Sequence, residues 1–442
     1  ALASSWNVDL LKEIGQAIGQ EAQAQDVQVV LGPGVNIKRG PLGGRNFEYY
    51  SEDPILSGYL AAAFIKGVQS QGVGTSLKHF AVNNQEFQRM AIDAVVDERT
   101  LREIYLRGFE IAVKEARPTT IMSAYNKVNG LYCTEHPRLL KEILKDEWNY
   151  EGILISDWGA NNDRIAGIEA GMHVEMPGSG GATDQKIVEA VRNGQLDEAR
   201  LNEVLGEILT IVLKLDESKK TGVSFDPQAH HTLAKKAASE SVILLKNEEN
   251  ILPLKASQKV AVIGNFAKEP RYQGAGSSLV MATQVDAAWE MMTEISDAGA
   301  LSFVPGYSAF DQIEEDLIQD AVEKAQAADV AILFIGLPPK YESEGFDRDH
   351  MELPAQHNRL VDAISKVQPN TVVVLTNGSA VTMPWIGEVK GILEGWLSGQ
   401  ASGAAIADIL YGKVNPSGKL SETFPVKLAD TPAYINWPGE QR

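Results

Sequence analysis

The first half of the chain alternates short apolar runs with longer amphipathic stretches. Short runs of apolar or β-branched residues indicate buried strands, and an apolar position every three or four residues indicates a helix. The predicted strands are residues 27–31, 75–77, 119–124 and 153–156, with 173–176 as a weaker fifth. The predicted helices are residues 8–24, 54–70, 97–116 and 137–148. Alternating strands and helices predict a parallel sheet in an α/β fold.

Polar and charged residues follow directly after several of the predicted strands. They are Asn36 and Arg45, Lys78 and His79, Tyr125 and Asn126, and Asp157. In (β/α)8 barrels the carboxyl ends of several strands deliver the catalytic residues. Only about five strands can be identified, against eight in a closed barrel. We therefore predict a (β/α)8-type barrel, incomplete at its N-terminus, over residues 1–216, and we expect the chain to begin inside a longer polypeptide.

The second half repeats the alternation after a polar, aperiodic stretch at residues 217–226. That stretch predicts a linker, which we place at residues 217–230. Strands are predicted at residues 260–263, 330–334, 371–375 and 391–394, and helices at 312–327 and 355–367. This pattern predicts a doubly wound α/β sandwich domain over residues 231–442, with helices on both faces of its sheet.

The excess of acidic residues argues against some classes of binding partner. The chain carries 59 acidic and 40 basic residues, for a net charge of −19. Such a field repels nucleic acid and anionic lipid, so we expect neither a nucleic-acid nor a membrane partner. No apolar run approaches the ~18 residues of a membrane helix. No metal or nucleotide motif of the HExxH, CxxC, Walker or EF-hand type occurs, so no cofactor is predicted.

The sequence is compatible with a cytoplasmic, a periplasmic or a secreted location. A lone cysteine, Cys133, excludes an intrachain disulfide and is typical of a reducing compartment without establishing one. The first residues show no charged segment followed by an apolar segment, so no secretory signal is visible in this chain.

Two groups of residues in the first half are candidates for catalysis. Asp157 ends an apolar strand and precedes Trp158, whose ring offers a flat face to a sugar; the alternative is an aspartate that caps the next helix. Lys78 and His79 supply adjacent donors, but successive strand residues point to opposite faces. Both reach one site only if the strand has ended, and an ordinary ion pair plus a core histidine is the alternative.

Other candidates lie on loops. Arg45 follows a glycine-rich turn, and Arg89 lies in a polar stretch after Lys78. Glu342 and Glu344 occupy a polar loop after a predicted strand of the second unit, the usual ligand edge of a parallel sheet. A solvated, charged surface is the alternative interpretation for each of them.

A series of motifs runs along the chain at residues 31–36, 44–48, 50–54, 78–80, 123–126 and 156–158, followed by 241–247, 344–348 and 415–419. Taken together, these motifs resemble glycoside hydrolase family 3. No single motif is decisive, but their order along nearly the whole chain is specific. The family usually also has an upstream segment with a sugar-binding aspartate, and many members end in a β-sandwich; neither is visible here.

The resemblance implies a role for each candidate. Asp157 matches the family's nucleophile and Glu344 its acid/base, with Glu342 as the competitor two residues earlier. The residues implied to line or border the glycone pocket are Arg45, Lys78, His79, Arg89, Tyr125, Trp158 and Ser277. The stretch after Lys78-His-Phe80 contains no further histidine, which argues against the hexosaminidase branch of the family.

The implied activity is that of a retaining β-glycosidase, because two carboxylates in distinct roles are what glycoside cleavage needs. The favoured function is a β-glucosidase that removes terminal non-reducing β-D-glucosyl residues through a covalent glycosyl-enzyme. Its expected substrates are β-glucosides and short β-linked oligosaccharides. A β-xylosidase, another exo-β-glycosidase and a non-catalytic sugar-binding relative stay open. We also expect a homodimer, since pairing covers the apolar surface that a missing sandwich would leave bare.

Overall fold

A computed structural model describes residues 1–309 and 312–440, and the chain divides into two compact units. The barrel-type unit contains Asn7–Lys38 and Tyr49–Phe225. The sandwich unit contains Ala1–Trp6, Arg39–Glu48 and the chain from Asp226 onward. Arg39–Glu48, which we call the strap, therefore belongs to the sandwich unit although both of its flanks belong to the barrel-type unit.

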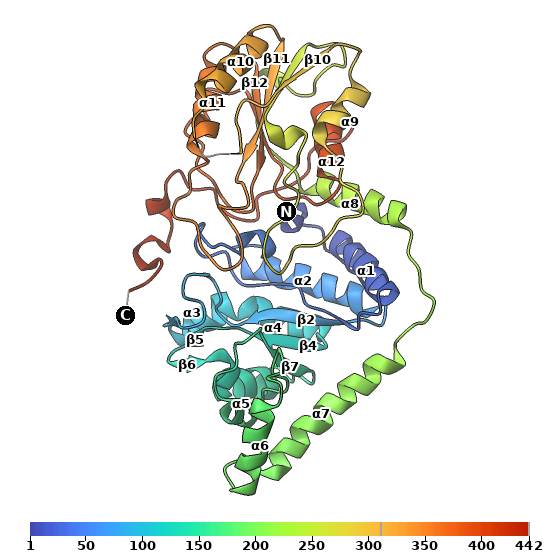
Figure 1. Cartoon of the computed structure of the whole chain (residues 1–442), viewed down its shortest axis with the longest axis vertical. Coiled ribbons are helices and arrows are strands. Elements are labelled where there is room, and N and C mark those ends of the chain that lie inside the picture. Colours follow the sequence, from blue (N-terminus) through green and yellow to red (C-terminus); the bar gives the residue numbers. More distant parts are fainter. Residues whose placement is uncertain (310–311, 441–442) are drawn as a thin grey trace. The chain divides into compact units, whose positions relative to one another are not determined.

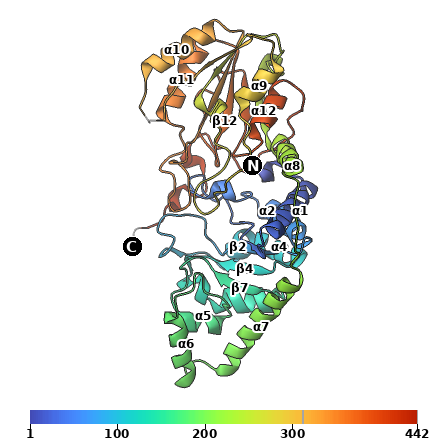
Figure 2. The same ribbon diagram turned by 45° about the vertical axis from the view of Figure 1, so that its right-hand side comes forward.

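The barrel-type unit is built on a four-stranded sheet with the order β1-β2-β4-β7 among the described residues. The strands are β1 Val29–Val30, β2 Gly74–Phe80, β4 Thr120–Ser123 and β7 Ile153–Ser156. Each pairs in parallel with the next, and β2, β4 and β7 lie side by side in both views (Figures 1 and 2). The four main predicted strands are thus confirmed. The weaker fifth gives one bridge, between Val174 and Ile155.

Helices connect these strands, as the alternation predicts. They are α1 Val8–Ala24, α2 Pro54–Gln69, α3 Glu98–Thr100, α4 Arg107–Ala116, α5 Arg164–Ala170, α6 Ala182–Arg192 and α7 Glu198–Glu217. The side chain of Asn7 caps α1 by accepting from two backbone N–H groups, and Asp53 caps α2 just before its first-turn proline. A small separate sheet holds β3 Asp93–Ala94, β5 Lys127–Val128 and β6 Leu131–Tyr132.

Two predicted helices differ in detail. The helix predicted at 97–116 is interrupted by a π-helical segment, Leu101–Tyr105, between α3 and α4. The one predicted at 137–148 is π-helical over Arg138–Glu147. Helix α7 was not predicted. Its exposed side also carries apolar side chains, so its sequence lacks a clear amphipathic pattern.

The sandwich unit contains a six-stranded sheet with the order β10-β9-β11-β12-β13-β8 among the described residues. All neighbours pair in parallel except β13 and β8, which are antiparallel. The strands are β8 Ile243–Asn247, β9 Val260–Ile263, β10 Leu301–Val304, β11 Val330–Gly336, β12 Thr371–Thr376 and β13 Gly391–Glu394. The four predicted strands are confirmed, and β8 and β10 are additional edge strands.

Helices cover both faces of this sheet (Figure 1). They are α8 Pro227–Ser241, α9 Ala288–Ile295, α10 Glu315–Gln326, α11 Ala355–Ser365 and α12 Ser402–Leu410. Alternate residues of each central strand point to opposite faces. In β11, for example, Leu333 packs in one core with α10 and α11, and Ile332 in the other with α9 and α12. The predicted fold class, an incomplete barrel-type unit followed by a doubly wound α/β sandwich, is confirmed.

Within the described ranges, no helix combines the length and the low polarity that crossing a membrane requires.

Candidate active site

The carboxyl ends of β2, β4 and β7 bring three sequence-predicted groups to one edge of the barrel-type sheet. His79 lies at the end of β2, Tyr125 follows β4 and Asp157 follows β7. The backbone N–H of Asp157 donates to the carbonyl of Ser123 across the β4–β7 pair, at 3.1 Å. Parallel pairing therefore places residues that are far apart in sequence at neighbouring strand ends.

Asp157 lies beside His79 at this edge. The distance between Oδ2 of Asp157 and Nε2 of His79 is 3.6 Å. The other oxygen, Oδ1, accepts from the backbone N–H of Trp158 at 2.8 Å. Asp157 is only 7% exposed, whereas the neighbouring Trp158 is 43% exposed. A nearly buried carboxylate thus adjoins an indole that is accessible to a ligand.

The orientation of His79 is fixed by two residues that sequence reasoning did not assign to the site. The side-chain amide of Asn36 donates to the carbonyl of His79 at 2.9 Å and accepts from its N–H at 2.8 Å. The hydroxyl of Tyr49 lies 3.1 Å from Nδ1 of His79, which leaves Nε2 on the side of Asp157. The only sequence signal for Asn36 is its place at the end of the first strand.

A β-bulge lies in β2 at Lys78 and His79. The register between β2 and β4 shifts between Leu77 and Phe80, so β2 carries one residue more than its partner. This bulge interrupts the alternation that would send the two side chains to opposite faces. The backbone of Lys78 accepts from Val35 at 2.8 Å and donates to Pro33 at 3.0 Å, which continues the pairing on the β1 side.

Arg89 and Tyr125 stack on each other in the same unit. The guanidinium carbon of Arg89 lies 4.4 Å from the centroid of the Tyr125 ring. Its Nη1 also donates to Glu86 at 2.7 Å, and the Glu86 carboxylate is almost completely buried. The cation is therefore held by a ring and a carboxylate, in a geometry that favours one orientation of the guanidinium.

The two competing glutamates of the sandwich unit have different surroundings. Glu342 is 1% exposed, and its carboxylate accepts from Arg271, Gly378 and Ser379. The side chain of Glu344 is 15% exposed, and its Oε2 accepts from the backbone N–H of Ser277 at 2.7 Å. Of the two carboxylates, Glu344 is the one with access to solvent.

The strap brings a cation close to Glu344 within the sandwich unit. Nη1 of Arg45 lies 3.7 Å from Oε1 of Glu344. Glu48 holds the guanidinium through two bonds of 2.8 Å each, from Nε and Nη2. The backbone N–H of Gly44 also donates to Asp347 at 2.8 Å. Arg45 and Ser277 thus adjoin Glu344, whereas the other predicted site residues belong to the barrel-type unit.

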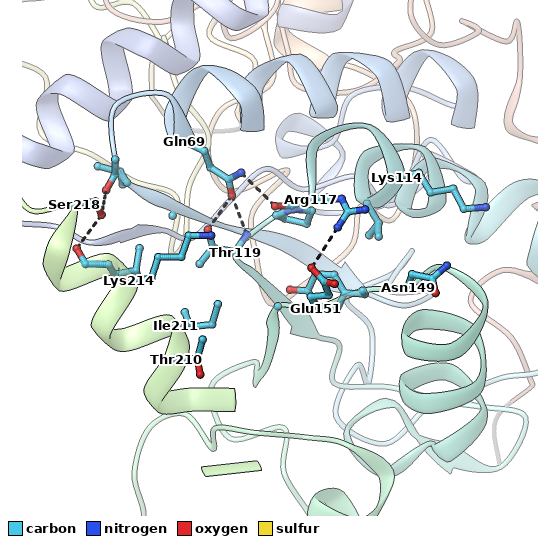
Figure 3. Close-up of a pocket in the computed structure, with 18 of the residues that line it drawn as sticks. Gln69, Lys114, Arg117, Thr119, Asn149, Glu151, Thr210, Ile211, Lys214 and Ser218 are labelled. Atoms are coloured by element: carbon cyan, nitrogen blue, oxygen red, sulfur yellow. Dashed lines mark hydrogen bonds and ion pairs between the residues drawn. The ribbon is translucent and has the colours of Figure 1, made fainter. Parts of the chain in front are cut away.

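A cavity of about 780 Å³ opens at the opposite edge of the barrel-type sheet, at the amino ends of β2, β4 and β7 (Figure 3). Gln69 lies at its wall and accepts from the N–H and hydroxyl of Thr119 at 2.8 and 2.9 Å. Glu151 is the one carboxylate among the residues that line the cavity, and its Oε2 lies 3.3 Å from Nη1 of Arg117. None of the sequence-predicted site residues lines it, so this cavity is not the candidate active site.

Within the residues that the structure describes, no group of three or more histidine, cysteine, aspartate or glutamate side chains is arranged to hold a metal ion.

Comparison with known protein families identifies the family of both parts of the chain. Residues 1–211 match the model of the glycosyl hydrolase family 3 N-terminal domain, and residues 242–441 match that of its C-terminal domain. The chain belongs to glycoside hydrolase family 3, as the serial motifs predicted.

Two relatives illustrate the range of the family. The chain is 56% identical to "Thermostable beta-glucosidase B" of Acetivibrio thermocellus over 99% of its own length and 58% of that protein. It is 46% identical to "Exo-alpha-(1->6)-L-arabinopyranosidase" of Bifidobacterium breve over 100% of its own length and 59% of that protein. The chain thus spans less than two thirds of the length of these relatives.

Two solved structures share the fold. The GH3 β-glucosidase of Bifidobacterium adolescentis superposes with a TM-score of 0.96 at 48% identity, covering 100% of this chain and 65% of that one. β-Glucosidase 3B of Thermotoga neapolitana in complex with glucose superposes with a TM-score of 0.90 at 38% identity, covering 99% and 66%.

Proposed function

We propose that this chain is the catalytic part of a retaining β-glucosidase. It would remove terminal β-D-glucosyl residues from β-glucosides and short β-linked oligosaccharides. The observation that carries the proposal is the 56% identity to a thermostable β-glucosidase over nearly the whole of this chain. The β-glucosidase structures that it superposes on, one of them in complex with glucose, support the same function.

We assign Asp157 as the nucleophile. Its carboxylate is held at a strand end by the N–H of Trp158 and lies beside Nε2 of His79. In the first half-reaction a carboxylate oxygen attacks the anomeric carbon, the bond to the leaving oxygen breaks, and a glycosyl-enzyme forms. The exposed face of Trp158 is suited to an apolar face of the sugar.

We assign Glu344 as the acid/base. It protonates the leaving oxygen in the first half-reaction and removes a proton from the incoming water in the second. Proton transfer requires a carboxyl group that substrate can reach. The partial exposure of Glu344 and the threefold hydrogen bonding of buried Glu342 support Glu344 as that group.

The glycone-binding roles are proposed for the cations and hydroxyls around the two carboxylates. Lys78, His79 and Arg89 supply donors for sugar hydroxyls in the barrel-type unit, beside the ring of Tyr125. Arg45 and the Ser277 segment supply donors beside Glu344. The proposed reaction needs both carboxylates at one glycosidic bond, about 5–5.5 Å apart in retaining enzymes.

A panel of nitrophenyl glycosides tests the proposal. We expect hydrolysis of the β-D-glucoside, and its loss in Asp157→Asn, which keeps the size of the side chain but removes the nucleophilic charge. Incubation with a 2-fluoro-glucosyl inhibitor followed by peptide mass spectrometry should label Asp157. Absence of turnover on every member of the panel would favour a sugar-binding relative instead.

A second candidate function is an exo-glycosidase for a pentopyranose. The 46% identity to an arabinopyranosidase over the whole chain favours it. Pentopyranosides lack the exocyclic hydroxymethyl group of glucose, so the panel should include nitrophenyl α-L-arabinopyranoside and β-D-xylopyranoside. A higher kcat/KM on either than on the β-glucoside would select this candidate.

A further inference from the structure

We propose that Glu342 is a positioning residue that fixes the loop carrying Glu344. The inference rests on the proposed function, because it takes Glu344 as the acid/base. Glu342 and Glu344 share one loop between β11 and α11, and the buried Glu342 ties this loop to the loops after both β9 and β12. Its role would be to hold its neighbour in place rather than to touch substrate.

Three donors converge on the Glu342 carboxylate from two other loops. Oε1 accepts from Nη1 of Arg271 at 2.6 Å and from the backbone N–H of Gly378 at 2.7 Å. Oε2 accepts from the hydroxyl of Ser379 at 3.1 Å. Arg271 follows β9 and the Gly378–Ser379 turn follows β12, so one carboxylate joins the ends of three neighbouring strands.

Arg271 extends this connection to the end of β11. Its Nη1 also donates to the carbonyl of Leu337, directly after that strand. Arg271 and Glu342 have side-chain exposures of only 4% and 1%. Because the pair is buried, removal of the carboxylate would leave a guanidinium without its anion in a low-dielectric site.

A second anchor holds the far end of the same loop. Nη1 of Arg348 donates to the hydroxyl of Ser379 at 2.9 Å and to the carbonyl of Ala380 at 2.8 Å. Ser379 therefore accepts from Arg348 and donates to Glu342. The loop is fastened at both ends to one turn, and Glu344 lies between the two anchors.

The turn at Gly378 is closely packed against Glu342 and the strap. A Cβ on Gly378 would lie 3.1 Å from both carboxylate oxygens of Glu342 and 2.4 Å from Cβ of Phe47 in the strap. In the middle of the loop, Ser343 and Phe346 form an antiparallel bridge around Glu344. A change at Glu342 is therefore transmitted through backbone that has little room to adjust.

The position of Glu344 matters because a general acid acts over hydrogen-bonding distance. A displacement of about 1 Å can cost about 10²-fold in rate. That loss falls on substrates whose leaving group needs a proton. A dinitrophenolate leaves without one, so its release should change little when the acid is misplaced.

The test compares Glu342→Gln with the parent on dinitrophenyl β-glucoside and methyl β-glucoside. Glu342→Gln preserves the size of the side chain and removes the charge that faces Arg271. We expect kcat/KM to fall about 10²-fold on the methyl glucoside and to change little on the dinitrophenyl glucoside. Ser379→Ala, which removes one donor, should give the same pattern with a smaller loss if Glu342→Gln folds poorly.

Azide separates a positioning role from an acid/base role. Glu344→Ala should be accelerated by azide and yield glucosyl azide, whereas Glu342→Gln should not, because a carboxylate still stands at position 344. Asp286→Asn is a matched control: Asp286 is a buried carboxylate of the same unit, bonded to His231 at 2.9 Å and to Gln284 at 3.0 Å. It should leave the leaving-group dependence unchanged.

Hydrogen exchange of the peptide around residues 342–348 gives a readout that does not need activity. We expect faster exchange in Glu342→Gln than in the parent or in Asp286→Asn. If the parent is inert on every glucoside but this difference remains, the proposed function fails and the positioning stands. Unchanged exchange, azide rescue of Glu342→Gln, or equal losses on both glucosides in a folded variant would overturn the inference.

Discussion

The carboxylate of Glu344 accepts a hydrogen bond of 2.7 Å from the backbone N–H of Ser277. The two residues lie 67 positions apart in sequence, and the bond joins the loop after β9 to the loop after β11. A backbone donor fixes the orientation of the carboxylate that accepts from it.

Replacement of Glu344 should separate acid catalysis from nucleophilic attack. General acid–base catalysis contributes about 10²–10⁴-fold, so Glu344→Ala should lose that much kcat/KM on poor leaving groups. On dinitrophenyl β-glucoside, azide should restore much of the rate by attacking the glycosyl-enzyme. Steady-state kinetics with and without azide measure both effects. A variant that keeps parental activity on methyl β-glucoside would show that Glu344 is not the acid.

Gly276→Ala should displace Glu344 without changing either carboxylate. Gly276 has φ +93°, and an added Cβ would lie 2.4 Å from Cβ of Glu344. Gly299→Ala is the matched control, because Gly299 has φ +78° but no atom near the added Cβ. Both variants strain the backbone, yet only Gly276→Ala should lower kcat on alkyl glucosides. Equal activities of the two variants would contradict the prediction.

The stereochemistry of hydrolysis should be retaining. Attack by Asp157 inverts the anomeric centre once and attack by water inverts it again, so the first sugar released has the configuration of the substrate. Proton NMR during the first minutes of the reaction distinguishes the anomers before they equilibrate. Release of the α-anomer first from a β-glucoside would remove Asp157 as the nucleophile.

Glu394 should make the free energy of unfolding depend on pH. Its side chain is fully buried, and burial raises its pKa to about 8. The unfolded carboxyl loses its proton at lower pH than the folded one, so stability falls as pH rises from about 5 to about 8. The whole shift corresponds to on the order of 5 kcal/mol. Denaturant titrations across that range should show a flatter profile for Glu394→Gln than for the parent; parallel profiles would argue against this account.

We predict self-association through α7. Its exposed apolar side chains Leu205, Leu209, Val212 and Leu213 recur at helical spacing on the barrel-type unit. Pairing of two copies buries such a row. Light scattering should report a homodimer, and Leu209→Glu should dissociate it while Ile386→Glu, an exposed residue of the sandwich unit, should not. A strict monomer of 48.0 kDa at micromolar concentration would contradict the prediction.

The sequence by itself determined the alternation of strands and helices and the positions of the central strands along the chain. Apolar runs such as Ile153–Ser156 can only be buried, and parallel pairing then brings the residue that follows each run to one sheet edge. That reasoning predicted Asp157 and His79 at the carboxyl ends of strands of one sheet, where the structure places them. The serial motifs, taken in order along the chain, indicated the family.

Only the tertiary structure decided how individual side chains are held. The bulge beside Lys78, the Tyr49 contact to His79 and the assignment of the strap to the sandwich unit depend on register and packing, which no local pattern encodes. Glu342 and Glu344 look alike in sequence because both are carboxylates in a polar loop. They differ in the structure because Arg271 and the turn after β12 approach one and leave the other accessible, and burial is a property of the surroundings rather than of the residue.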